Sequence, residues 1–316
     1  ECKFTNYSKA KYKSDAEIES NIKHLLENIE IKRREVEKKR KQERETAAAL
    51  ATKIYNKSDI YTQHYTEENP HPYLKKKNLY TIINGVKIIK AEVASKLVGD
   101  AYGKTNYKLF GSDGELKGDL LVIPIHNISG EFTSLQFIDI NGNKSFLKDG
   151  AKSFFEITGN APTFNNVAVA EGLATGGSIK LALPTHKVFI SFDAGNLSNV
   201  VGEIVKANSN AKITIFADND KESHTGEIQA KKAVEAHGGK YIMPPAEYKD
   251  FCDFWTAEFA NNNGDFNAVI SNMQNYISQA LKNKNVKKYR FIQTETKRVM
   301  SVERAKTKNE NEVGKI

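Results

Sequence analysis

The fold is decided by the stretch VAVAEGLATGGSIKLAL (residues 167–183), followed by VFISFDAGN (188–196) and ITIFADNDKESHTGEIQAKKA (213–233). Short apolar runs in this part of the chain predict three strands, at Val167–Ala170, Val188–Phe192 and Ile213–Ala217. The intervening stretches predict three helices, at Ser178–Leu183, Asn199–Asn208 and Glu227–His237. Strands that alternate with helices at this spacing are typical of an α/β fold, in which helices cover both faces of a parallel sheet.

Acidic residues follow two of the predicted strands at the point where each strand ends. Glu171 follows the first strand, and Asp218 and Asp220 follow the third. Because ligands of parallel sheets bind at the carboxyl ends of the strands, we expect these carboxylates to converge. Carboxylates held close together repel one another unless a cation lies between them, and oxygen ligands favour Mg²⁺ or Mn²⁺ over zinc. A single acid here would be explained as a helix cap, but three together predict a divalent-metal site.

Two glycine-containing segments near these strands suggest different roles. We interpret Gly172, Gly176 and Gly177 as positions at which the backbone approaches the metal site closely. The segment GDAYGKT (residues 99–105) is similar to a phosphate-binding P-loop. It has three residues between its glycines where that motif has four, and it follows a helix-like run instead of a strand. We therefore predict no nucleotide-hydrolysing motor.

The region before the parallel sheet has a different pattern. Short runs rich in β-branched residues predict strands at Tyr80–Ile83, Val86–Ile89, Leu120–Ile125 and Ser134–Ile140. Asn-Gly pairs at residues 84–85 and 141–142 predict hairpin turns, because both residues tolerate positive φ. Residues 59–160 are thus expected to form a smaller mixed domain in which antiparallel strands dominate.

Residues 15–55 have the spacing of a long helix. An apolar stripe at three- and four-residue intervals comprises Ile18, Ile22, Leu25, Leu26 and Ile29. The stripe fades into residues 32–45, which carry both signs of charge and a net charge of +4. A solvated connector helix and a phosphate-binding arm are both consistent with that composition.

Composition and charge limit the class of protein. The 316 residues suggest about two folded units, and no run approaches the roughly 18–20 apolar residues that a membrane-spanning helix needs. Two cysteines cannot form a disulfide framework, so we expect a cytoplasmic protein. The sequence starts at Glu1 without Met, as expected for a piece of a longer chain. The net charge of +8 is concentrated at the ends, with +7 in residues 282–316, whereas residues 161–281 carry −4.

The three stretches quoted first resemble a TOPRIM domain, the metal-binding fold of bacterial-type primases and of type IA and II topoisomerases. The likeness is greatest to the primases of plasmids and phages. It implies that Glu171 is the family's glutamate and that Asp218 and Asp220 are its metal-binding pair. The later segment YKDFCDFW (residues 248–255) is similar to the Asp-Phe-Asn-Asp segment that closes such domains, with Cys252 in place of Asn. Thr175 stands where the cellular replicative primase has a further acid.

The preceding domain resembles the same primases in HPYLKKKNL (residues 71–79) and in residues 122–157. This resemblance implies that Lys144, Lys148 and Lys152 face the phosphates of nucleotide or template from the other wall of a catalytic cleft. The cellular enzymes use arginines in this wall, whereas lysine binds phosphate as a point charge. Ordinary exposed hairpin lysines are the alternative explanation.

The resemblance implies the catalytic core of a DNA primase, a nucleotidyltransferase that makes short RNA primers with Mg²⁺ or Mn²⁺ as cofactor. Its catalytic residues would be Glu171, Asp218 and Asp220. Its partners would be single-stranded DNA, ribonucleoside triphosphates and a replicative helicase, with no membrane. A TOPRIM nuclease, of the overcoming-lysogenisation or RNA-maturase type, and a non-catalytic nucleic-acid-binding subunit are the alternatives.

The expected organisation has four parts. A charged helical segment covers residues 1–58, the nucleotide and template wall covers 59–160, the TOPRIM domain covers 161–262, and a basic helix or tail covers 263–316. The tail is expected to hold the template strand, so deletion of residues 282–316 is expected to weaken DNA binding and flatten its salt dependence.

Overall fold

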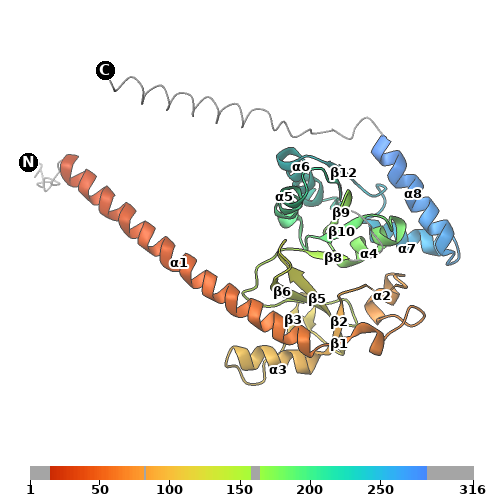
Figure 1. Cartoon of the computed structure of the whole chain (residues 1–316), viewed down its shortest axis with the longest axis horizontal. Helices are drawn as coiled ribbons and strands as arrows, with labels where there is room; N and C mark the ends of the chain where they lie inside the picture. The colour runs from red at the N-terminus through yellow and green to blue at the C-terminus, as the bar shows by residue number, and fades with distance from the viewer. Residues whose placement is uncertain (1–14, 82, 158–163, 283–316) are drawn as a thin grey trace, which may run out of the picture. The chain divides into compact units, whose positions relative to one another are not determined.

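The computed structural model describes residues 15–81, 83–157 and 164–282 (Figure 1). The chain divides into a first unit that ends at Thr46 and a second unit that begins at Ala47. Helix α1 (Asp15–Lys57) is continuous, which confirms the predicted long helix. The basic tail after residue 282 lies outside the described residues. Within the described ranges, no helix is long and apolar enough to cross a membrane.

The second unit begins with an antiparallel sheet. Its strands are β1 (Asp59–Ile60), β2 (Lys87–Lys90), β5 (Asp119–His126), β6 (Phe132–Ile138) and β7 (Lys144–Phe146), in the order β1-β2-β5-β6-β7. The surrounding elements are η1 (Tyr61–Gln63), α2 (Pro72–Lys76), α3 (Ala91–Ala101), β3 (Phe110–Gly111) and β4 (Gly114–Glu115). One face of the sheet packs on α3 and on the last turns of α1, where Leu50 and Ile54 are buried. The expected antiparallel character of this region is therefore confirmed.

One of the two predicted hairpins forms. The turn Asn141–Gly142 joins β6 to β7, with Gly142 at φ 94° and its N–H donating to the Asp139 carbonyl at 3.0 Å. The prediction of a strand at Tyr80–Ile83 is wrong. Leu79 and Ile83 are buried in a core shared with later helices, so the described part of this segment packs its side chains between elements and pairs with no named strand.

The parallel sheet follows with the expected alternation. Its strands are β8 (Phe155–Ile157), β9 (Asn166–Ala170), β10 (Lys187–Ile190), β11 (Lys212–Phe216) and β12 (Lys240–Ile242). Its helices are α4 (Leu173–Ala182), α5 (Leu197–Ala207), α6 (Thr225–His237), α7 (Phe251–Asn261) and α8 (Phe266–Lys282), with a short η2 (Ala194–Asn196). The strand order is β12-β11-β9-β10-β8, and only the edge strand β8 runs antiparallel to its neighbour. The predicted strands and helices of this region are confirmed, with differences of one or two residues at most ends, but α4 begins at Leu173, five residues before the predicted start at Ser178.

Helices cover both faces of this sheet, as predicted (Figure 1). Side chains alternate between the faces of a strand, and β9 shows this directly. Val167 and Val169 pack in a cluster with residues of α5 and α6, whereas Ala168 and Ala170 pack in a cluster with α4, α7 and α8. The α/β fold class expected from the sequence is therefore present.

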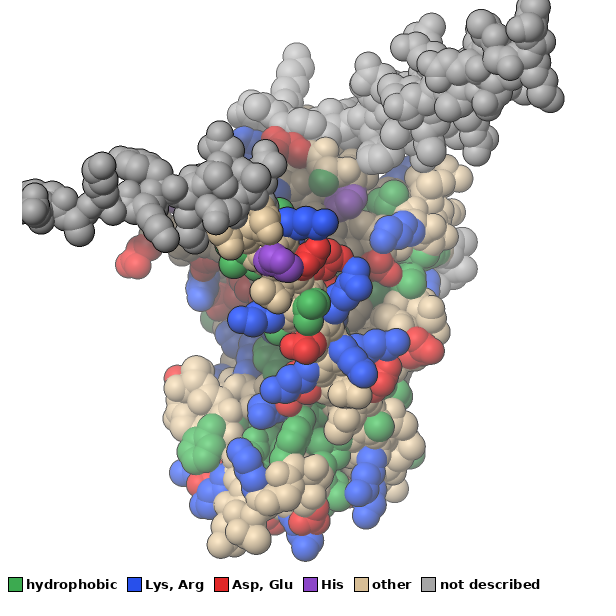
Figure 2. Space-filling view, turned by 90° about the vertical axis from the view of Figure 1, so that its left-hand side faces the viewer, with side chains coloured by type: hydrophobic (Ala, Val, Ile, Leu, Met, Phe, Trp, Pro, Cys, Tyr) green, Lys and Arg blue, Asp and Glu red, His purple; other side chains and the backbone are tan. Residues whose placement is uncertain are grey.

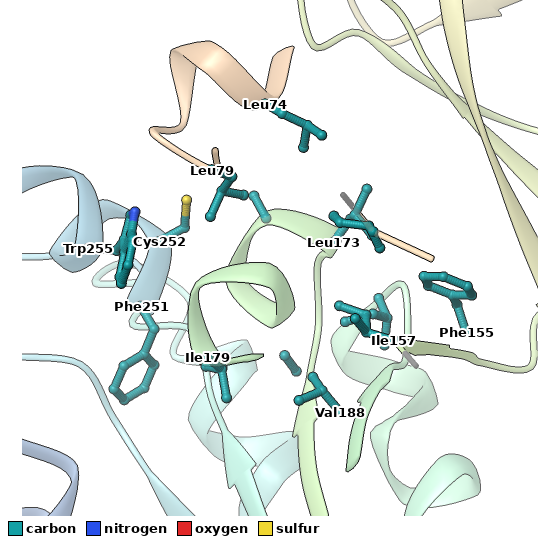
Figure 3. Packing of buried hydrophobic residues seen from close by; sticks show 14 of the residues in the cluster. Leu74, Leu79, Phe155, Ile157, Leu173, Ile179, Val188, Phe251, Cys252 and Trp255 are labelled. Carbon is teal, nitrogen blue, oxygen red and sulfur yellow. The ribbon is translucent and has the colours of Figure 1, made fainter. Parts of the chain in front are cut away.

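The two sheets share one hydrophobic core (Figure 3). Leu79, from the antiparallel region, lies beside α4 and near Cys252 of α7 in this view. Trp255 on α7 is fully buried and donates its indole N–H to the carbonyl of Asn78 at 2.9 Å. This packing holds α2 and the first sheet in a defined position beside the carboxyl end of the parallel strands.

Candidate active site

Glu171 lies directly after β9, at the carboxyl end of the strand. The Ala170 carbonyl accepts a hydrogen bond from the backbone N–H of Ser191 at 2.9 Å, so the strand pairs with its neighbour up to this point. Gly172 then caps α4 in extended conformation. The strand and the helix therefore fix the backbone on both sides of a half-buried carboxylate.

Asp218 and Asp220 lie in the loop that leaves β11. The Ala217 N–H donates to Ile242 of β12 at 3.0 Å, which keeps the strand paired to its last residue. The intervening Asn219 donates its backbone N–H to the Lys249 carbonyl at 2.6 Å and its side-chain amide to the Tyr248 carbonyl at 3.1 Å. The loop is thus attached to the segment that precedes α7.

The start of α6 packs against the same loop. Gly226, in the first turn of α6, is buried, and a Cβ atom at this position would collide with the backbone carbonyl of Asp218. Glycine is therefore the residue that allows the helix to approach the carboxylate loop. No sequence pattern indicated a role for this glycine, because its partner lies eight positions earlier and the geometry of the intervening turn cannot be predicted from a pattern.

The roles predicted for the other glycines need correction. A Cβ at Gly176 would collide with Ile190, and a Cβ at Gly177 would press against Leu79. Both glycines lie on α4 and let this helix pack closely on β10 and on the antiparallel region. A Cβ at Gly172 would meet open space. Gly176 and Gly177 therefore serve helix packing instead of backbone approach to a metal, and no neighbour requires a glycine at position 172.

The electrostatics of the carboxylate set are unusual. The pKa of Asp218 is raised to about 8, first by burial and then by the neighbouring charges of Glu171, Asp250 and Asp220, whereas Lys249 opposes the shift. The pKa of Glu171 is raised as well, first by burial and then by neighbouring acids. The Asp218 Oδ1 atom is buried and accepts no hydrogen bond from the residues that the structure describes. The site thus holds more negative charge than its surroundings neutralise.

Lysines face this acidic set from the other sheet. Lys144 on β7 lies with its ammonium group 5.9 Å from the centre of the Tyr73 ring. Although this residue is solvent-accessible, the surrounding protein desolvates its ammonium group and lowers its pKa, and nearby Lys77 lowers the pKa further. The charges of Asp218 and Glu171 act in the opposite direction, so Lys144 is within electrostatic range of both.

The other two predicted lysines differ in position. Lys152 pairs with Asp193 across 2.7 Å, and Asp193 is one of the acids that raise the pKa of Glu171. Lys148 instead lies 5.3 Å from the ring of Tyr102 and 3.7 Å from Asp149. The structure therefore places Lys144 and Lys152 near the acidic residues of the site, whereas Lys148 contacts Tyr102 and Asp149 instead. On the face shown in Figure 2, basic and acidic side chains are intermixed.

Four further charged residues belong to the site, and the sequence patterns did not assign them a role. They are Lys77, Asp193, Lys249 and Asp250. Asp250 accepts hydrogen bonds from the N–H groups of Cys252 and Asp253, so it caps α7 while its charge acts on Asp218. The segments FDAGN and YKDFCDFW contain three of these residues, which is the signal that could have indicated them.

A cavity of about 510 Å³ opens beside the carboxylate loop. Its lining includes Asp220, Lys221, Tyr248, Lys249 and Asp253. The cavity gives solutes access to Asp220 from the side of the loop, between the end of β11 and the start of α7. Both charge signs line it, which suits a ligand that carries phosphate groups together with a cation.

The chemistry of the donors fits a hard divalent cation. Glu171, Asp218 and Asp220 supply carboxylate oxygens, and an unpartnered buried oxygen such as Asp218 Oδ1 gains from a cation. In the described residues, no three His, Cys, Asp or Glu side chains converge closely enough to form a ligand set as they stand. Binding of an ion by all three acids therefore requires their side chains to rotate toward one another.

Comparison with known proteins identifies the class of this domain. Residues 166–261, which contain β9 to β12 and α4 to α7, match the family model described as the Toprim domain. Two curated relatives, each a DNA primase TraC of Escherichia coli, are 29% identical to the chain over 141 and 147 residues. The matches cover 40% and 42% of this chain, but only 13% and 10% of the relatives' length. The expected similarity to plasmid-type primases is confirmed.

Solved primase structures also align with the chain. The catalytic domain of the DnaG primase bound to single-stranded DNA has 12% identity and a TM-score of 0.45, covering 76% of this chain and 84% of that one. The primase fragment of the bacteriophage T7 primase-helicase has 14% identity and a TM-score of 0.39, covering 71% and 74%.

Proposed function

We propose that this chain is the catalytic core of a DNA primase that synthesises short RNA primers on single-stranded DNA by nucleotidyl transfer. The observation that carries this proposal is the Asp218 carboxylate, which has a buried oxygen without a hydrogen-bond partner and a pKa raised to about 8. It lies at the carboxyl edge of a Toprim sheet, within electrostatic range of Lys144 on the antiparallel sheet. The names of the curated relatives support the same activity.

Glu171, Asp218 and Asp220 are the residues that would hold Mg²⁺ or Mn²⁺. When bound, such an ion neutralises the phosphates of a nucleotide and the charge that develops during their transfer. The Asp218 pKa implies that at neutral pH the ion-free site is largely protonated at this residue, so ion binding is coupled to proton release.

The lysines supply the positive charge for phosphate. Lys144 and Lys152 would bind the triphosphate of a ribonucleotide or the template backbone as point charges, which requires no particular base. Lys249 would contribute from the opposite side, since its charge already acts on both Glu171 and Asp218. Template contacts of this kind make affinity dependent on salt and nearly independent of sequence.

Glu171 is the candidate general base. Its raised pKa brings it closer to neutrality than an exposed glutamate, which improves its capacity to accept the proton of a primer 3′-hydroxyl at a carboxylate oxygen. Its position after β9 keeps it in place while Asp218 and Asp220 approach from β11. Asp218 and Asp220 would thus be the principal ligands of the ion, and Glu171 would be either a further ligand or the group that accepts the proton.

A product assay tests the proposal. The chain is incubated with single-stranded DNA, labelled ribonucleoside triphosphates and Mg²⁺ or Mn²⁺, and the products are resolved by length beside a sample that contains a chelator. Labelled dinucleotides and longer RNAs that depend on the ion support a primase. Cleavage of the DNA or of added RNA without synthesis would replace the proposal with a metal-dependent Toprim nuclease, and binding without either reaction would leave a nucleic-acid-binding subunit.

A further inference from the structure

Helix α1 carries exposed apolar side chains between residues 22 and 36. Their exposed fractions lie between 40% and 60%, and they comprise Ile22, Leu25, Leu26, Ile29, Ile31 and Val36. Every side chain from Ser20 to Thr46 is exposed apart from the half-buried Glu43. At 3.6 residues per turn all of these except Ile31 share one side of the helix and form an apolar stripe. A long helix in water gains most of its stability from packing its apolar side, so an uncovered stripe indicates that a partner covers it.

The charge of the helix reverses along its length. Residues 15–31 contain five acidic residues and one lysine, a net charge of −4, whereas residues 32–45 contain eight basic and four acidic residues, a net charge of +4. The apolar residues are concentrated in the acidic half and in the first turns of the basic half. A partner that covers the stripe must therefore match a negative segment followed by a positive one.

We propose that α1 pairs with α1 of a second copy of this chain in antiparallel orientation, centred near residue 27. In this register, Leu25 of one copy lies beside Ile29 of the other, and the same contact occurs twice by symmetry. Residues 15–22, with three acidic and no basic residues, then run along residues 32–39 of the second copy, which have five basic and two acidic residues. One copy thus supplies both the apolar surface and the complementary charge.

The alternatives fit the same surface less well. A parallel pair would place the two −4 segments together and the two +4 segments together, which is destabilising. Nucleic acid would match the basic half, but it would be repelled by the acidic half and would leave the apolar stripe exposed to water. The second copy is the occupant that satisfies all three features of the helix.

Molar mass in solution tests the pairing. In sedimentation equilibrium, the full chain is expected to reach twice its monomer mass of 35.4 kDa as concentration rises, with a dissociation constant that increases with salt. The double substitution Leu25→Glu and Ile29→Glu is expected to return the mass to that of the monomer. Ile228→Glu is the matched control, because Ile228 is an apolar side chain of α6 with 45% exposure, and it should leave the dimer intact. Thermal melting followed by circular dichroism verifies that each variant folds.

A distance measurement tests the orientation independently of those variants. A nitroxide is attached to Lys38→Cys in a chain that carries Cys2→Ser, while Cys252 is buried. Antiparallel pairing centred on residue 27 separates the two labels by 22 residues, or roughly 33 Å at 1.5 Å per residue. Parallel pairing would give roughly 10 Å, the spacing of packed helices. A distance of roughly 10 Å between the labels would overturn the proposal. A dimer that survives the double substitution would overturn it as well, as would a chain that stays monomeric and uses the basic half of α1 only to bind DNA.

Discussion

The ammonium group of Lys152 lies 2.7 Å from Oδ2 of Asp193, which joins the segment before β8 to the start of η2. Both side chains are more than a third exposed, so the pair contributes little to stability. Asp193 also raises the pKa of Glu171, so Lys152 is paired with one of the acids that act on the proposed general base. We expect Lys152→Ala to cost at most about 1 kcal/mol of unfolding free energy. The same change should raise the KM for ribonucleotides several-fold, and an unchanged KM would remove Lys152 from the proposed phosphate site.

The two lysines on either side of Phe146 provide a matched comparison. Lys144 is within electrostatic range of Asp218 and Glu171, whereas Lys148 lies against Tyr102 and Asp149. Lys144→Ala should reduce primer synthesis by about 10- to 150-fold, since a hydrogen bond to a charged group is worth about 1.5–3 kcal/mol. Lys148→Ala should change the rate less than about twofold. Equal losses in steady-state rates would show that both lysines bind a shared, more extended template.

Asp218 makes the stability of the ion-free protein depend on pH. Its pKa is about 8 in the folded state, whereas the ordinary pKa of an aspartate side chain is 3.8. Between these values the folded state holds a proton that the unfolded state has lost. The unfolding free energy therefore decreases as pH rises, by at most about 1.4 kcal/mol per pH unit. Asp218→Asn should remove this contribution and be more stable than the parent at pH 7.5.

Urea denaturation with a chelator at pH 5 and pH 7.5 measures this difference directly. Asp113→Asn is the control, because Asp113 is an exposed carboxylate at the turn between β3 and β4. The parent chain and this control should lose stability in parallel between the two pH values. If Asp218→Asn lost as much unfolding free energy between pH 5 and pH 7.5 as the parent chain, Asp218 would not be held protonated by its surroundings.

Gly226 allows α6 to approach the carboxylate loop, and a Cβ there would collide with the Asp218 carbonyl. Gly226→Ala should destabilise the fold by about 1–3 kcal/mol, the usual cost of overpacking, and should also displace Asp218 and reduce catalysis. Gly172→Ala is the comparison, because its Cβ would meet open space and its φ is −112°. Thermal unfolding and primer synthesis of both variants test this, and similar behaviour of the two would contradict it.

Trp255 connects the two sheets through its indole hydrogen bond to Asn78. Trp255→Phe keeps most of the packing but leaves the Asn78 carbonyl without this donor, at an expected cost of about 1–3 kcal/mol. The exposed Phe110 provides the control, since Phe110→Leu should shift stability by less than about 0.5 kcal/mol. Chemical denaturation distinguishes the two, and a neutral Trp255→Phe would show that packing alone holds the sheets together.

The parallel region was predicted well from the sequence because each of its strands has the same short apolar pattern, which depends only on neighbouring residues. Strands buried on both faces, such as β9, are continuous apolar runs, and the acids that follow them must meet at one edge once the strands are parallel. The segment Tyr80–Ile83 misled the prediction, since its β-branched residue Ile83 is buried in the core that the two sheets share. Strand propensity does not distinguish β-branched side chains in a paired strand from those that an unpaired segment buries in a core.

The site was predicted less completely than the sheet. Lys77 and Asp250 are far apart in sequence, and the fold brings α2 and α7 together through Leu79 and Trp255. The distinction between Lys144 and Lys148 depends on where β7 ends, at Phe146, which no residue pattern marks. The position of Gly176 against Ile190 likewise follows from how α4 packs on β10, which only the assembled structure shows.

The most direct test of the central claim is incorporation of labelled ribonucleotides on single-stranded DNA in the presence of Mg²⁺, compared among the parent chain, Asp218→Asn and Asp113→Asn. The parent and Asp113→Asn should produce the same RNA products at the same rate. Asp218→Asn should lose at least about 100-fold in rate while its far-ultraviolet circular dichroism stays that of the parent, because a ligand that meets developing charge is worth about 3 kcal/mol. Primer synthesis by Asp218→Asn at the rate of the parent chain would contradict the assignment of this carboxylate edge as the catalytic site.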